Sequence, residues 1–106
     1  MRMLLKVSIP VETGNKAAIH GTLAPTIQKI LADIKPEAAY FAEDNGERTG
    51  YIFFDMEKSS DLPRIAEPWF LAFDAKLTLR PAMTPGDLAE SLPGIQAAVK
   101  SFGTGA

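Results

Sequence analysis

The sequence contains no cysteine, and it has only one histidine and one tryptophan among 106 residues. Without cysteine the chain can form no disulfide, and it has no thiolate to act as a nucleophile or as a zinc ligand. The absence is compatible with a reducing compartment, because cytosolic proteins seldom use disulfides. We therefore expect a cytoplasmic protein.

Basic clusters and long apolar runs are also missing. Eleven Lys and Arg residues against thirteen Asp and Glu residues give a formal net charge of −2, and no basic block of the kind that binds nucleic acid stands out. No apolar run approaches the roughly 20 residues of a membrane-spanning helix. The N-terminal run MRMLLKVSIPVE is interrupted too early for a signal peptide. We expect neither a nucleic-acid partner nor a membrane partner.

Recognisable cofactor and metal motifs are absent as well. The chain has no glycine-rich phosphate loop. Its acidic residues do not have the spacing of an EF-hand or of a metal site made of two carboxylates and a histidine. The sequence therefore predicts no metal and no cofactor.

What the sequence does contain is a regular pattern of apolar residues. Alternation over 3–11 and 76–80 predicts strands. Thr13 offers an N-cap, and apolar residues spaced by three and four from Ile19 to Ile34 then predict an amphipathic helix with a kink at Pro25. A second helix begins near Ser59 or Ser60, and its Pro68 predicts a kink or a break. Its apolar side comprises Ile65, Ala66, Trp69, Phe70 and Phe73.

The stretch YFAEDNGERTGYIFF, residues 40–54, predicts a hairpin. Asn45-Gly46 is a dipeptide that favours a type I′ turn, because both central residues of that turn need a positive φ. A two-residue loop pairs Glu43 with Arg48, which have opposite charges. It also pairs Phe41 with Gly50, so that an aromatic ring covers a bare glycine.

The chain end carries a further helical pattern. Thr84-Pro85-Gly86-Asp87 resembles a capping box and predicts a short helix to about Leu92. Pro93-Gly94 interrupts it, and a last turn carries Ile95, Val99 and Phe102.

The predicted order β-α-β-β-α-β is the ferredoxin-like arrangement of the α+β class. It places a four-stranded antiparallel sheet under two helices on one face, with a C-terminal helix in addition. We expect a single domain over residues 1–102 and a flexible tail over 103–106.

The sheet face away from the helices is unusual for a surface in water. Tyr40, Tyr51 and Phe53 lie at its centre, and Lys6, Lys76 and Arg80 lie at its flanks. One interpretation is a homodimer in which two sheets stack into an eight-stranded barrel, since a contiguous aromatic patch is expected to meet a partner. The other interpretation is that this face is exposed to water, which its Ser, Thr and Lys side chains allow. We predict the homodimer. Asp55 shares this face and is a possible ion-pair partner for Lys6.

A family resemblance rests on this element order and on two segments, YFAEDNGERTGYIFFDME and AEPWFLAFDAKLTLRPAMTPGDL. Over residues 1–92 the chain resembles the dimeric α/β-barrel group. In particular the chain is similar to small uncharacterised bacterial proteins of that group. The group includes cofactor-free monooxygenases, muconolactone-type isomerases and haem-handling enzymes, so the resemblance implies a fold and no single activity. No active-site motif carries over. The one histidine, His20, lies away from the predicted barrel, which disfavours haem.

Several side chains are candidates for a site. Tyr40, Tyr51, Arg80 and the nearby Lys76 form either a pocket for an anionic ligand or part of the dimer contact. Glu67 and Trp69 flank Pro68, and a break there turns Glu67 inward as a general base. Without that break they are a solvated glutamate and a core tryptophan.

Two functions are compatible with these patterns. The first is a small homodimeric protein that binds a hydrophobic or anionic molecule. The second is a cofactor-independent monooxygenase or isomerase that acts on a small aromatic or polyketide-like substrate. Its substrate would lie between the sheet and the helices, against Tyr40, Tyr51 or Trp69, with Glu67 as the base.

Overall fold

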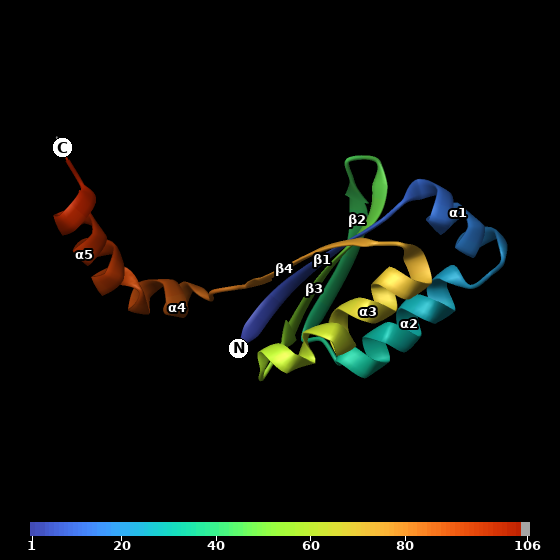
Figure 1. Cartoon of the computed structure of the whole chain (residues 1–106), viewed down its shortest axis with the longest axis horizontal. Coiled ribbons are helices and arrows are strands. Elements are labelled where there is room, and N and C mark those ends of the chain that lie inside the picture. The colour runs from blue at the N-terminus through green and yellow to red at the C-terminus, as the bar shows by residue number, and fades with distance from the viewer. Residues whose placement is uncertain (105–106) are drawn as a thin grey trace.

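The computed structural model describes residues 1–104, and it shows a sheet with helices on one side and a helical arm beyond the sheet (Figure 1). The elements are β1 (Arg2–Ile9), α1 (Val11–Ile19), α2 (Leu23–Ile34), β2 (Ala38–Asp44), β3 (Glu47–Asp55), the 3₁₀ turn η1 (Ser59–Asp61), α3 (Leu62–Phe73), β4 (Lys76–Pro81), α4 (Pro85–Glu90) and α5 (Leu92–Phe102).

The four strands form one antiparallel sheet in the order β2-β3-β1-β4. The central strand β1 lies between β3 and β4, so Leu5 has Ile52 on one side and Leu79 on the other. This order, with α2 and α3 on one face, is the ferredoxin-like fold. The predicted α+β class and element order are confirmed.

The β2–β3 hairpin has the predicted register. Phe41 pairs with Gly50 and Glu43 pairs with Arg48. The turn residues Asn45 and Gly46 have φ values of 56° and 80°, as a type I′ turn requires. The Gly46 N–H also donates a hydrogen bond of 3.1 Å to Oε2 of Glu43.

The first helical segment differs from the prediction. Instead of one helix with a kink at Pro25, the chain forms α1 and α2, separated at residues 20–22. Gly21 has a φ of 73°, a conformation that glycine adopts without strain and that ends the helix. Pro25 then lies in the first turn of α2, where a missing N–H is harmless because that N–H has no helical acceptor. Ile19 was predicted to lie in the apolar stripe of the helix, but it is 82% exposed.

The second main helix also differs, because α3 continues through Pro68 without a break. Pro63 lies in its first turn, and Asp61 precedes it without a side-chain cap. Continuity keeps Ile65, Trp69 and Phe73 on one face, where all three are buried.

The core lies between the sheet and the layer formed by α2 and α3 (Figure 1). The buried strand residues on the helix side are apolar and alternate along each strand with the residues of the opposite face. The buried apolar residues are Met3, Leu5, Val7, Ile9, Ile30, Ile34, Ile52, Phe54, Met56, Ile65, Trp69, Phe73 and Ala75.

The C-terminal arm, residues 82–104, leaves the end of β4 and extends away from the sheet (Figure 1). The Thr84 side chain accepts a hydrogen bond from the Asp87 N–H, and the Asp87 side chain accepts one from the Thr84 N–H, both at 3.0 Å. The predicted capping box is therefore confirmed. The break that follows falls at Ser91 rather than at Pro93-Gly94, since Pro93 is accommodated in the first turn of α5.

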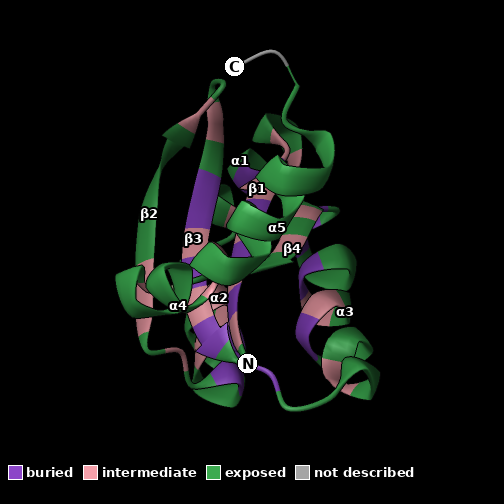
Figure 2. Cartoon of the chain, turned by 90° about the vertical axis from the view of Figure 1, so that its left-hand side faces the viewer, coloured by how far each residue is buried: buried purple, intermediate pink, exposed green. Residues whose placement is uncertain are grey.

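The arm makes the molecule elongated. The described chain measures 58 × 29 × 22 Å and has a radius of gyration of 17.7 Å, against about 13 Å for a compact domain of this length. Neither α4 nor α5 contains a buried residue, and Figure 2 colours both almost wholly as exposed. The predicted tail falls in part on residues 105 and 106, which lie outside the described residues.

Candidate functional site

A groove of about 630 Å³ opens on the helix side of the sheet, between the β2–β3 hairpin and helices α1 and α2. Its apolar lining comes from β1, both helices and the hairpin, with Trp69 contributed by α3. A set of polar residues lies on the hairpin and α1. The lining residues are Val7, Ile9, Val11, Asn15, Leu23, Ile27, Phe41, Ala42, Glu43, Gly46, Glu47, Arg48, Thr49, Gly50 and Trp69.

The break between α1 and α2 shapes this groove. It lets α1 dock against the hairpin as a separate wall, where Gly14 is buried beneath Arg48. A Cβ at Gly14 would lie 2.7 Å from Nη1 of Arg48, so only glycine leaves room for this approach without a shift. Nη2 of Arg48 donates a hydrogen bond of 3.1 Å to Oδ1 of Asn15, which joins the two walls.

The hairpin wall depends on a second glycine. The ring of Phe41 lies over Gly50, and a Cβ there would meet Cε1 of Phe41 at 2.9 Å. Phe41 itself remains 53% exposed although its strand phase faces the helices. Its ring therefore stays partly open to solvent, where it lines the groove.

Trp69 combines full burial with an unused donor. Its side chain is 0% exposed, and its ring lies 6.3 Å from that of Phe73. Within residues 1–104 its Nε1–H is buried without a hydrogen-bond partner. A buried donor without an acceptor costs about 1 to 3 kcal/mol of stability. The indole N–H of Trp69 therefore destabilises an otherwise apolar region.

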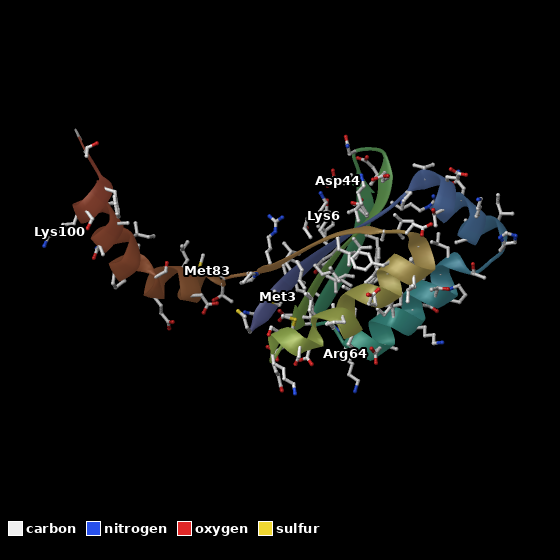
Figure 3. The ribbon with its side chains drawn as sticks, viewed as in Figure 1. Met3, Lys6, Asp44, Arg64, Met83 and Lys100 are labelled. Carbon is white, nitrogen blue, oxygen red and sulfur yellow. The ribbon has the colours of Figure 1, made fainter. Side chains whose placement is uncertain are left out.

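The opposite face of the sheet carries a connected polar cluster. Oδ2 of Asp44 accepts hydrogen bonds from the Tyr51 hydroxyl and from Nζ of Lys6, each at 2.7 Å. Figure 3 shows Lys6 and Asp44 close together near the hairpin. Asp55 is not the partner of Lys6, because it accepts a 2.7 Å hydrogen bond from the N-terminal amine of Met1 instead.

The contacts within this cluster shift the pKa values of its members. The hydrogen bond from Lys6, aided by that from Tyr51, lowers the pKa of Asp44. The hydrogen bond to Asp44 raises the pKa of Lys6 and also that of Tyr51. Tyr51 is therefore kept as a neutral donor, which makes it unsuited to act as a base.

The predicted site residues do not come together in one place. Trp69 lines the groove, whereas Tyr40, Tyr51 and Arg80 lie on the opposite sheet face. Tyr40 is 66% exposed, and Arg80 is exposed on β4. Glu67 is exposed on the unbroken α3 and is not among the residues that line the groove.

Several residues at these sites were not predicted. Phe41, Arg48 and Asn15 shape the groove, but the separation of α1 from α2 that brings them together has no clear sequence signal. Asp44 is different, because the hairpin register already places it on the face of Tyr51. Strand alternation alone therefore places both side chains on one face, but it does not give the hydrogen bond between them.

Other chemistry finds little support in the described part of the chain. His20 is exposed at the C-terminal end of α1 and does not line the groove. No group of three histidine or carboxylate side chains in residues 1–104 is arranged to hold a metal ion. The longest described helices have 12 residues each, too few to cross a bilayer.

Comparison with known proteins bears on the fold alone. No protein family and no curated protein matches the sequence. Among solved structures, a formyltetrahydrofolate deformylase from Pseudomonas putida KT2440 is similar, with a TM-score of 0.50 and 14% sequence identity. The match covers 77% of this chain but only 29% of the deformylase chain. It supports the ferredoxin-like arrangement and leaves function to the chemistry of the described residues.

Proposed function

We propose that this chain is a homodimeric binding domain of the dimeric α/β-barrel type, and that it holds a small hydrophobic molecule in the helix-side groove. The groove itself carries the proposal. Its 630 Å³ lies within the range of about 300 to 1,000 Å³ typical of small-molecule sites. Its walls are largely apolar, with polar groups gathered on the hairpin and α1.

The polar groups indicate which kind of molecule fits. Arg48 and Asn15 offer donors, which suit an acceptor at one end of an apolar ligand. Glu43 and Glu47 line the same groove. Two carboxylates beside one guanidinium disfavour a further negative charge, so the ligand is a hydrophobic molecule with an uncharged acceptor rather than an anion.

The single tryptophan gives a direct test, because Trp69 lines the groove and is the only indole in the chain. Titration with decanamide should change its fluorescence in a saturable way, and decanoate should bind at least tenfold more weakly. Val11→Lys places a charge in the groove and should weaken decanamide binding at least tenfold. Ile19→Lys lies outside the groove on the same helix and should leave binding unchanged.

A saturable response to neither probe would overturn the proposed binding function. Equal weakening by Val11→Lys and Ile19→Lys would overturn the assignment to this groove. Decanoate binding as tightly as decanamide would overturn the preference for an uncharged head group.

The homodimer part of the proposal concerns the opposite sheet face. Leu4, Tyr51 and Phe53 are only half-buried there, and Tyr40 projects further. The Lys6 and Asp44 charges neutralise each other and the Tyr51 hydroxyl already has an acceptor. Burial of this cluster against a second sheet about 10 Å away therefore leaves few unpaired groups.

Light scattering tests the dimer. The wild-type chain should have twice the monomer mass, and Tyr40→Lys should shift it toward the monomer because a charge would enter the contact. Leu71→Lys is the matched control, since Leu71 is 82% exposed on α3, on the other side of the sheet. A monomeric wild-type chain would refute the dimer and leave the groove proposal standing.

The base predicted for the enzyme hypothesis does not lie where the ligand would bind. Glu67 is exposed and does not line the groove. Of the carboxylates that do, Glu43 is already engaged as the acceptor of the Gly46 N–H. We therefore propose binding rather than monooxygenase or isomerase activity.

A further inference from the structure

Helix α5 carries an apolar stripe that touches nothing in the body of the molecule. We define the α5 seam as Leu92, Ile95, Val99 and Phe102, which are spaced by three, four and three residues. All four are exposed, and Phe102 reaches 81%. The arm projects from the end of the sheet, and Figure 3 places Met83 at its start and Lys100 near its far end.

The spacing of the seam is that of positions a and d in a heptad, the pattern with which one helix packs lengthwise on another. A strict a/d stripe is narrower than the apolar face that a helix presents to a globular core. The seam therefore points to a helix as its partner, rather than to a sheet face or a deep pocket.

The charged residues of α5 indicate which kind of partner the seam binds. The single ionised side chain of α5 is Lys100, which lies outside the seam. Helices that lie on membranes carry many Lys and Arg residues on their polar face, and α5 does not. The seam is flanked by Gln96 and Ala98, so no charge at the flanks selects a different partner or repels an identical helix.

We infer that the α5 seams of two copies of this chain pack against each other and clamp the homodimer. This inference rests on the proposed homodimer, which brings the two arms to a high effective concentration. The exposed area of the four seam side chains is on the order of 400 Å² per chain, about half of what each partner buries in a standard interface. The seam thus adds to the sheet contact rather than replacing it.

The test uses the absence of native cysteine. Val99→Cys is labelled with a benzophenone maleimide, mixed with isotope-labelled wild-type chain, irradiated and mapped by mass spectrometry. Insertion should occur in residues 92–102 of the other copy, because packed helix axes lie roughly 8 to 10 Å apart. Ala97→Cys is the matched control on the opposite side of α5, and it should give little insertion.

A second measurement relates the contact to affinity. Val99→Glu should raise the dimer dissociation constant at least tenfold, whereas Ala97→Glu should leave it unchanged. Both residues are exposed, so neither change disturbs the core.

The outcomes separate the two proposals. A dimer in which the benzophenone on the Val99→Cys chain inserts into the groove of the other copy, or nowhere, overturns the seam pairing and leaves the homodimer standing. A chain that stays dimeric with Tyr40→Lys but becomes monomeric with Val99→Glu overturns the sheet contact and, with it, the role of the seam as an addition to that contact. A monomeric wild-type chain overturns both.

Discussion

The substitution Trp69→Phe should have two opposing effects on the free energy of unfolding, both at one buried position. Trp69 is 0% exposed and its Nε1–H has no acceptor within the described residues. The smaller ring leaves a gap of about 40 Å³, which costs about 1 kcal/mol, and lost transfer free energy adds about as much. Removal of the unpaired donor returns about 1 to 3 kcal/mol. The net change in the free energy of unfolding should therefore lie within about 1 kcal/mol of zero.

Two further variants calibrate this expectation. Trp69→Ala removes the whole ring and should cost about 3 to 5 kcal/mol. Phe54→Leu changes a ring that is 1% exposed and has no polar atom, so it receives no compensation and should cost about 1 kcal/mol.

Urea unfolding followed by circular dichroism, at one fixed protein concentration, measures all three. With a slope of about 1 to 1.5 kcal/mol per molar urea, Trp69→Ala should lower the midpoint by at least about 2 M. A loss above about 2.5 kcal/mol for Trp69→Phe would refute the reasoning, since it would mean that the indole N–H has a partner.

Two other changes test the turn and the polar cluster. Gly46→Ala should destabilise the fold by about 1 kcal/mol because its φ of 80° is strained for alanine, while Gly94→Ala, in open space on α5, should not; equal denaturation midpoints for the two variants would contradict this. The pKa of Asp44 is lowered in the folded state, so its contribution to stability is present above the ordinary value of 3.8 and is lost as pH falls through the folded value. Lys6→Met should therefore lose less stability on acidification than the wild-type chain, as denaturation at pH values on either side of 3.8 will show, and an equally steep loss would count against the cluster.

The hairpin was predictable because its signals are local. The Asn45-Gly46 turn fixes the register, and the register with strand alternation assigns each side chain to a face. Both the pairing of Phe41 with Gly50 and the apolar phase toward the helices follow from these rules alone.

The prolines were harder to interpret. Pro25 and Pro68 predict distortion within a helix, yet the first lies in a helix start and the second is tolerated inside α3. The actual break lies at Gly21, which has a positive φ. Glycine can either continue a helix or end it, and tertiary packing decides between the two. The groove depends on that break, so its location could not be derived from the sequence.

The arm shows a second limit of sequence reasoning. Periodicity predicts that Ile95, Val99 and Phe102 share a side of a helix. It does not say what that side contacts, and a helix packed on its own sheet has the same pattern as one that waits for another chain.

The central position of β1 has a consequence for how the chain folds. Its neighbours β3 and β4 come from residues 47–55 and 76–81. The sheet is therefore complete only after strands that are far apart in the sequence have paired. Such distant pairing slows folding relative to helical proteins. The sheet and its helices therefore form one cooperative unit that is complete only with β4, while the arm can fray and re-form without opening the core.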